Sequence, residues 1–152
     1  MCGISGVFGI HGPLWPDAGA SVRAMNAAIA HRGPDGDGFY DSERAVFGQR
    51  RLAIIDVAGG RQPMCNEDGS CWITFNGEIY NHRSLRAVLQ DRGHVFRTAS
   101  DTETILHAYE EFGPSCVDRL EGMFAFAIYD SRQQTFFAAR DRLGKKPFFY
   151  TV

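Results

Sequence analysis

Apolar residues recur along the chain with two different spacings, and these spacings predict strands and helices. Short apolar or alternating runs, bounded by turn-forming Gly, Pro, Asn and Asp, are typical of strands. The predicted strands are residues 4–10, two strands on either side of a turn at Ser42–Glu43, and residues 52–55, 71–75, 94–98, 123–130, 135–141 and 145–152. Asp68–Gly69 predicts a hairpin turn just before the strand at 71–75.

Apolar residues at helical spacing predict three amphipathic helices, over residues 20–32, 82–93 and 101–112. Their inward faces are expected to be Val22, Met25 and Ile29; Leu85, Val88 and Leu89; and Ile105, Tyr109 and Phe112. The third helix begins with Ser100, and Glu103 three residues later completes a capping box.

The order of these elements predicts an α+β fold. Most strands follow one another as hairpins, and few helices connect them, which favours antiparallel sheets with helices packed outside. A length of 152 residues is typical of a single domain. The last predicted strand stops at Val152, so we expect an open sheet edge there.

Composition excludes several classes of function. The net charge is −2 and no basic block occurs, which argues against a nucleic-acid partner. No apolar run reaches the length of a membrane span, and the start lacks the features of a signal peptide. The four cysteines show neither a paired motif nor a zinc-like spacing with the five histidines. We therefore expect reduced thiols, a cytoplasmic location and no metal site.

Cys2 is the first candidate for chemistry. Once Met1 is removed, Cys2 carries the α-amino group, whose pKa of about 8 suits it to take a proton from the thiol. The same amine can then protonate a departing ammonia or amine. A cysteine at position 2 also occurs by chance, and cysteine often behaves as a small buried hydrophobe. Its position alone does not decide between the two interpretations.

Four further residues have a catalytic and an ordinary interpretation. An Asn76 amide and a Gly77 backbone N–H at the end of a strand can form an oxyanion hole, although Asn-Gly is also a common turn. Arg51 can hold a carboxylate or lie in a surface ion pair. Asp101 can receive an ammonium group or simply favour a helix start. Together with Cys2 they suit a free amino acid that carries a side-chain amide.

The sequence resembles the glutaminase domain of the glutamine-hydrolysing asparagine synthetases, within the class II, N-terminal nucleophile, glutamine amidotransferases. The resemblance covers the whole chain through the segments MCGISGVFG, HRGPDGDGFY, RLAIID, GGRQPM, FNGEIYN, SDTETILHAYEEFG, LEGMFAFAIYD and ARDRLGKKPFFY. It implies a four-layer αββα sandwich of two antiparallel sheets. Gln49 departs from the pattern, because relatives often have His there.

The resemblance also implies roles for particular residues. It makes Cys2 the nucleophile after loss of Met1, and it makes Asn76 and Gly77 the oxyanion hole. The implied glutamine pocket consists of Arg51, Leu52, Ala53, Ile54, Ile55, Asn76, Gly77, Glu78 and Asp101. The expected reaction is hydrolysis of L-glutamine to glutamate and ammonia through a cysteine thioester.

The resemblance implies a longer enzyme than this chain. We expect residues 1–152 to be a truncated glutaminase domain, incomplete at its C-terminus, because the synthetases that it resembles continue well past this length. The synthetase domain is expected to be absent, since no phosphate-binding loop occurs in the sequence. ATP and magnesium would belong to that missing domain or subunit, which would accept the ammonia, and no cofactor is expected on this chain. Two alternatives stay open: a non-catalytic glutamine-binding module, or an ammonia donor for a different carboxylate acceptor. A homodimer is also left open.

Overall fold

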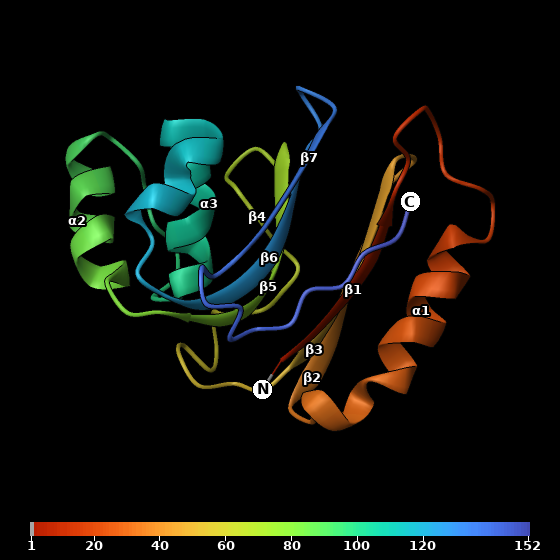
Figure 1. Ribbon diagram of the computed structural model, residues 1–152. Coiled ribbons are helices and arrows are strands. Elements are labelled where there is room, and N and C mark those ends of the chain that lie inside the picture. The colour runs from red at the N-terminus through yellow and green to blue at the C-terminus, as the bar shows by residue number, and fades with distance from the viewer. Residues whose placement is uncertain (1) are drawn as a thin grey trace.

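Two antiparallel sheets lie face to face in a computed structural model that describes residues 2–152, and helices cover both outer surfaces (Figure 1). The strands are β1 (Gly3–Phe8), β2 (Gly36–Asp41), β3 (Ala45–Arg51), β4 (Met64–Cys65), β5 (Cys71–Ile79), β6 (Gly122–Asp130) and β7 (Thr135–Arg140). The helices are α1 (Ala18–Ala28), η1 (Ala30–Arg32), α2 (His82–Asp91), α3 (Asp101–Phe112) and η2 (Gly113–Arg119). Within the described part of the chain, no helix is both long and apolar enough to cross a membrane.

The strand order confirms the α+β prediction and the αββα layering. One sheet has the order β1-β3-β2 and the other β4-β5-β6-β7, with every neighbouring pair antiparallel. In Figure 1, α1 covers the outer face of the first sheet, and α3 covers the outer face of the second with α2 beyond it. The predicted hairpin of β2 and β3 is present, and so is the turn at Asp68–Gly69.

Helix α1 packs on the first sheet through small and branched residues. Ala18, Val22 and Val46 form a buried cluster there. The prediction that Met25 faces inward is wrong, because Met25 is 39% exposed whereas its neighbour Asn26 is fully buried. Two hydrogen bonds join Asn26 to β3. Its Nδ2 donates to the Gln49 backbone carbonyl at 3.4 Å, and its backbone carbonyl accepts from the Arg50 Nε.

The space between the sheets is aromatic at one end. Phe47, Tyr129 and two alanines are buried there, and Tyr40 stacks on Trp72 with ring centroids 4.3 Å apart. Strand alternation brings every second residue of β3 to this face, so Gln49 follows Phe47 into the same layer. Gln49 is fully buried, and its side-chain nitrogen and oxygen have no hydrogen-bond partner among the described residues.

The largest hydrophobic cluster fills the space between the second sheet and helices α2 and α3. Leu85 and Leu89 point into it, whereas Val88, predicted to do so, is 44% exposed. Ser100 caps α3 as predicted, since its hydroxyl accepts from the Thr102 backbone N–H at 3.2 Å. The second bond of the capping box, from the Ser100 N–H to the Glu103 carboxylate, is absent. That carboxylate instead accepts from the backbone N–H groups of Arg97 and Thr98.

Three segments that were predicted to be strands have no regular secondary structure, and all three lack it for the same reason. In residues 94–98, two successive backbone N–H groups donate to the Glu103 carboxylate. In residues 145–152, the first two N–H groups donate to Asp141. In residues 52–55, one N–H donates to the thiol of Cys2 and the next to a carboxylate oxygen of another segment. Side chains thus take the donors that a sheet ladder would use.

Candidate active site

Cys2 lies just before β1, where the backbone of a distant loop holds its thiol. The Leu52 N–H donates to the Cys2 Sγ at 3.4 Å, and the Sγ is 3.5 Å from the Leu52 carbonyl oxygen. On the other side, the Arg32 Nε donates to the Cys2 carbonyl oxygen at 3.2 Å. The side chain is half-buried. Met1, on whose removal the catalytic interpretation depends, lies outside the described residues.

The other three cysteines are unsuited to nucleophilic attack. All four thiols are free of disulfides. Burial raises the pKa of Cys71 and Cys116 to about 12, and it also raises the pKa of Cys65. Since the thiolate is the reactive form, these three side chains stay protonated and inert near neutral pH. Cys2 is therefore the only remaining cysteine that could serve as a nucleophile.

The second half of β5 has a free edge that faces the candidate site. The short strand β4 pairs only with the first part of β5. Beyond it, side chains satisfy the edge: the Phe75 N–H donates to Gln62 Oε1 at 2.6 Å, and the Ile79 N–H donates to Asp101 Oδ2 at 3.0 Å. Alternate N–H groups of a strand point to the same side. The Gly77 N–H, midway between them, therefore points to this edge, where an oxyanion can accept from it.

Asn76 and Gly77 lie inside β5, so the prediction that the strand ends there is wrong. Gly77 pairs with Phe124 of β6, and the strand continues for two more residues. Phe75 belongs to the cluster under α3, so alternation turns Asn76 to the opposite face, toward the sheet of β1, β2 and β3. Asn76 is buried, with 4% of its surface exposed. An amide donor and a backbone donor thus come from successive residues of one rigid strand.

A small cavity joins most of the predicted site residues. Its volume is about 30 Å³, enough for one or two water molecules. It is lined by Cys2, Arg51, Leu52, Ile54, Ile55, Gly60, Gln62, Phe75, Gly77, Glu78, Ser100, Asp101 and Thr102. Two residues of the predicted pocket, Ala53 and Asn76, are not part of this lining. The Ala53 N–H donates to Asp35 Oδ2 at 2.9 Å, which holds the loop at the mouth of the cavity.

Arg51 organises the loop that follows β3. Its Nη1 donates to the Val57 carbonyl at 2.8 Å, and its Nη2 donates to the Asp56 carbonyl at 2.7 Å. The loop therefore curls around the guanidinium, and Ile54 is 64% exposed rather than buried in a sheet. A guanidinium has five N–H donors, so some remain for another acceptor. Its predicted grip on a substrate carboxylate stays a prediction.

Two carboxylates, those of Glu78 and Asp101, line the cavity. Burial raises the pKa of Asp101, and its hydrogen bond from the Ile79 N–H only partly offsets that effect. Burial also raises the pKa of Glu78, the nearby Asp101 charge raises it further, and the charge of Lys146 lowers it. A bound ammonium group would relieve the repulsion between the two carboxylates. The arrangement is suited to a positively charged part of a ligand.

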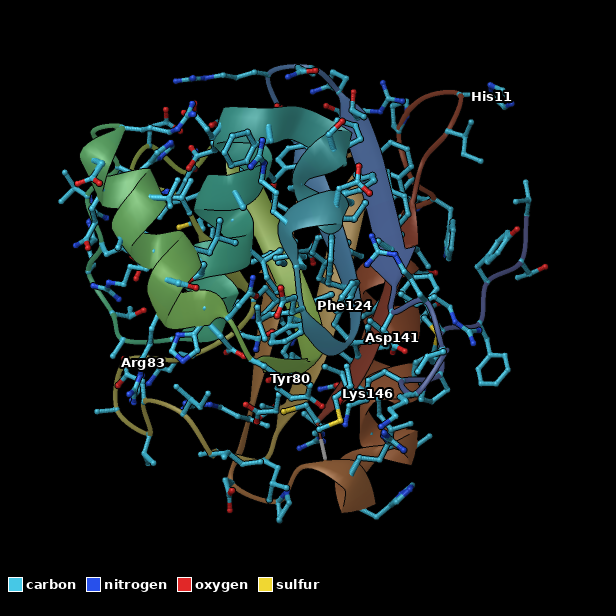
Figure 2. All side chains as sticks on the ribbon, turned by 60° about the vertical axis from the view of Figure 1, so that its left-hand side comes forward. His11, Tyr80, Arg83, Phe124, Asp141 and Lys146 are labelled. Atoms are coloured by element: carbon cyan, nitrogen blue, oxygen red, sulfur yellow. The ribbon has the colours of Figure 1, made fainter. Side chains whose placement is uncertain are left out.

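Several residues of the site had no assigned role in the sequence. Gln62 bridges two elements, because its Nε2 also donates to the Thr102 hydroxyl at 3.1 Å. Asp141, after β7, accepts from the backbone N–H groups of Phe124 at 3.2 Å and Lys146 at 3.0 Å (Figure 2). This anchor brings the buried Lys146 to the neighbourhood of Glu78. Gln62, Asp141 and Lys146 belong to the motifs GGRQPM and ARDRLGKKPFFY, but a motif alone does not show which distant segment each residue contacts.

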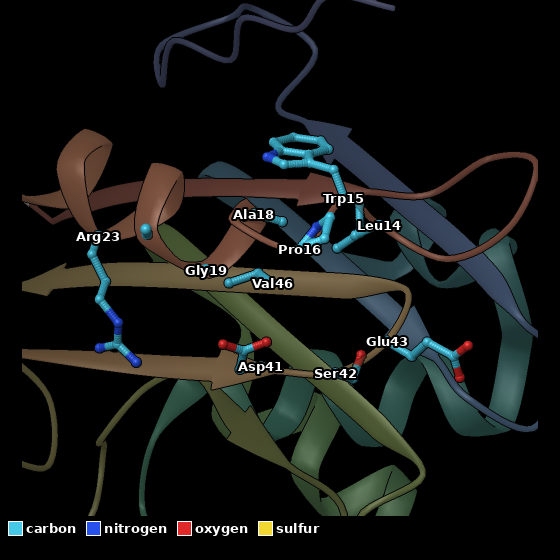
Figure 3. Close-up of a pocket in the computed structure, with 11 residues that line it drawn as sticks. Leu14, Trp15, Pro16, Ala18, Gly19, Arg23, Asp41, Ser42, Glu43 and Val46 are labelled. Atoms are coloured by element: carbon cyan, nitrogen blue, oxygen red, sulfur yellow. The ribbon is translucent and has the colours of Figure 1, made fainter.

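A larger hollow, of about 480 Å³, lies elsewhere on the molecule, between α1 and the hairpin of β2 and β3 (Figure 3). Trp15 and Pro16 lie on one side of it, and Arg23, Asp41 and Glu43 on another. Its lining contains no cysteine and none of the predicted site residues. The small cavity beside Cys2 is therefore the better candidate for catalysis, despite its size.

Comparison with known proteins identifies the family. A family model for the glutamine amidotransferase domain matches residues 1–152. The glutamine-hydrolyzing asparagine synthetase 1 of Bacillus subtilis (strain 168) is 46% identical over 154 residues, which cover 100% of this chain and 24% of the relative. Asparagine synthetase B of Escherichia coli (strain K12) is 43% identical over 149 residues, covering 98% and 26% respectively. The chain thus spans about a quarter of the length of these curated relatives.

Solved structures share the fold. The allosteric regulatory enzyme of purine biosynthesis has a TM-score of 0.72 and 21% identity, over 91% of this chain and 37% of that one. The glutamine phosphoribosylpyrophosphate amidotransferase of B. subtilis has a TM-score of 0.67 and 21% identity, over 84% and 35% respectively. The resemblance inferred from the sequence motifs is confirmed: the chain belongs to the glutamine amidotransferase domain family.

Proposed function

We propose that this chain hydrolyses L-glutamine to glutamate and ammonia, with Cys2 as the nucleophile. The observation that carries the proposal is the free edge of β5, where the Gly77 N–H points outward beside the cavity that Cys2 lines. Preorganised donors aimed at a developing negative charge are the largest single contribution in many acyl-transfer reactions. Membership of the glutamine amidotransferase domain family supports the same reaction.

The reaction proceeds in two stages. The Cys2 thiol gives its proton to the α-amine, and the sulfur forms a bond to the side-chain amide carbon of glutamine. The carbonyl electrons move to oxygen, where the Gly77 N–H and the Asn76 amide donate hydrogen bonds to the oxyanion. The carbon–nitrogen bond then breaks, the α-ammonium protonates the leaving nitrogen, and ammonia departs. Water hydrolyses the resulting thioester to glutamate and restores the thiol. Each step uses a side chain, the amine or water.

The charged ends of the substrate have partners in the same cavity. We infer that Arg51 receives the α-carboxylate, and the N–H groups that its loop does not use support this role. We infer that Asp101 and Glu78 receive the α-ammonium, because a positive charge would relieve the repulsion between them. The backbone of residues 52–55 forms the wall between them. A free amino acid with an amide side chain would thus be held at both ends of its backbone.

The ammonia is proposed to serve a synthetase part, since the curated relatives are named as glutamine-hydrolyzing asparagine synthetases and are about four times as long. ATP and magnesium would act in that part. The acceptor of the ammonia is proposed to be aspartate by analogy with those relatives. A different carboxylate acceptor, chosen by the synthetase part, would leave the chemistry at Cys2 unchanged.

The proposal is tested by incubating the chain, with removal of Met1 verified by intact mass, with glutamine and measuring glutamate. Cys2→Ala should abolish release, whereas the matched variant Cys65→Ala should keep it, because Cys65 lies outside the cavity. An electrophilic glutamine analogue should label Cys2 alone. Equal glutamate release from wild type and Cys2→Ala would refute the proposal. Glutamine binding without turnover in the processed chain would instead favour a non-catalytic binding module.

A further inference from the structure

A second group of titratable side chains lies along α3, away from Cys2. His107 is on α3, about 9 Å along the helix axis from Asp101, and is 1% exposed. Glu110 follows it on the same helix, and His94 approaches from the loop after α2. Each of the three offers one potential ligand atom, and these atoms all lie within 4.8 Å of one another. The group involves neither the cavity nor any residue of the proposed hydrolysis.

Both histidine rings lie near the same carboxylate oxygen, Glu110 Oε2. The His107 Nδ1 is 2.7 Å from Glu110 Oε2, and the His94 Nδ1 is 4.0 Å from the same atom. Ligand atoms about 2.0–2.2 Å from a zinc ion are roughly 3.3–3.5 Å apart in a tetrahedral site. The first distance would have to open and the second to close, each by roughly 0.6–0.7 Å. The two imidazole nitrogens, which lie within 4.8 Å of each other, would have to reach the same separation.

The opposite nitrogen of each ring faces a carboxylate. The His94 Nε2 is 3.2 Å from Glu111 Oε2. The His107 Nε2 is buried and has no hydrogen-bond partner among the described residues, and the nearest carboxylate oxygens, of Glu67 and Glu103, are at 3.8 and 3.9 Å. A histidine that binds a metal through one nitrogen turns its other N–H to a carboxylate. His94 has such an outer partner, whereas the carboxylate oxygens nearest the His107 Nε2 lie beyond hydrogen-bond distance.

The third ligand is also held in place. Asn66 Nδ2 donates to Glu110 Oε1 at 2.7 Å, and the Cys71 N–H donates to Asn66 Oδ1 at 3.0 Å. This chain fixes Glu110 to the hairpin of β4 and β5 and leaves its second oxygen toward the histidines.

We propose that His94, His107 and Glu110 form a binding site for a divalent first-row transition metal ion, of which Zn²⁺ best fits two imidazoles and one carboxylate. Water would complete the four-coordinate shell. The ion joins α3 to the loop after α2, so its role is structural: binding to the folded chain raises the free energy of unfolding. The hydrolysis of glutamine does not pass through it.

The test measures metal binding to the full chain. Zn²⁺ affinity is measured in competition with a chromophoric chelator, and Co²⁺ is bound in a parallel sample as a spectroscopic probe. We expect one equivalent to bind, a higher melting temperature with Zn²⁺, and a Co²⁺ spectrum with no thiolate charge-transfer band. His94→Gln and Glu110→Gln should each weaken binding at least tenfold. Neither variant removes a fully buried side chain, and circular dichroism verifies that each is folded.

The matched control is His11→Gln. His11 is an exposed histidine on the opposite side of the molecule from α2 and α3, so its loss should leave the metal affinity unchanged (Figure 2). The proposal is overturned by any of three results: no saturable binding by the wild type, equal affinity in the folded His94→Gln variant, or a thiolate band that assigns the metal to a cysteine. The glutaminase assay is independent of all three.

Discussion

Replacement of Gly77 by alanine tests the proposed oxyanion hole, because the backbone of β6 leaves no room for a Cβ at this position. A Cβ on Gly77 would lie 2.2 Å from the Met123 carbonyl oxygen and 2.7 Å from the Phe124 Cα. Both are backbone atoms of β6, so no side-chain rotation relieves the contact. Because real Cβ atoms essentially never approach within 3.0 Å, β5 has to move from β6 by about 0.8 Å, at an overpacking cost of about 1–3 kcal/mol.

The same displacement moves the Gly77 N–H from its place beside the cavity. A misplacement of about 1 Å, or the loss of one oxyanion donor, lowers kcat roughly 100-fold. KM should change little, since the oxyanion forms only in the transition state. The assay is glutamate release at several glutamine concentrations, together with urea unfolding of the same sample.

Gly36→Ala in β2 is the matched control for Gly77→Ala. A Cβ on Gly36 meets no atom within 4 Å, and its backbone is not left-handed, so kcat and stability should stay near those of the wild type. A folded Gly77→Ala variant with the kcat of the wild type would refute the proposed role of the Gly77 N–H.

Three further substitutions separate binding, catalysis and anchoring. Asn76→Asp keeps the shape but loses the N–H donors, so kcat should fall about 100-fold or more with little change in KM; an unchanged kcat contradicts its role. Asp101→Asn should raise the KM for glutamine roughly 10–100-fold, because the substrate ammonium loses its carboxylate partner. Steady-state kinetics that give the same KM for this variant and the wild type would exclude that contact. Asp141→Asn should lower the free energy of unfolding by about 1–3 kcal/mol at neutral pH. Burial acts to raise the pKa of Asp141, but backbone N–H donors outweigh it and lower the pKa below 3.8, so this stabilisation exists above that pH and is lost as the pH falls below it. Urea unfolding at neutral pH and about pH 3 should therefore show a smaller difference between Asp141→Asn and the wild type in acid, and a difference that does not depend on pH would contradict the anchor.

Much of the architecture could be predicted from local pattern. The strand-like and helix-like spacings of apolar residues predicted most strands, all three α-helices and the hairpin of β2 and β3. Burial of one face of an element imposes such a period on its sequence. Motif spacing led to the family and to Cys2. Faces were harder to assign: Met25 and Val88 fit the helical period but lie exposed. Which stripe is buried depends on the direction from which the sheet approaches.

The irregular segments could not be predicted because their partners are distant. Residues 52–55, 94–98 and 145–152 are apolar or alternating, yet carboxylates and the Cys2 thiol take their backbone donors. The Asn-Gly pair fits a turn, but β5 continues through it, since β6 supplies the ladder partners.

The sequence by itself determined the α+β class, the family and the residues that carry the proposed chemistry. Only the tertiary structure decided that the Gly77 N–H lies on a free strand edge. It also decided that Gln62 and Asp101 accept from the backbone N–H groups on either side of Gly77 along that edge, and that the rings of His94 and His107 lie next to each other. Periodicity records whether a residue is buried, a property of its own element. A catalytic or metal site depends on distances between elements, and those are set by how the layers pack.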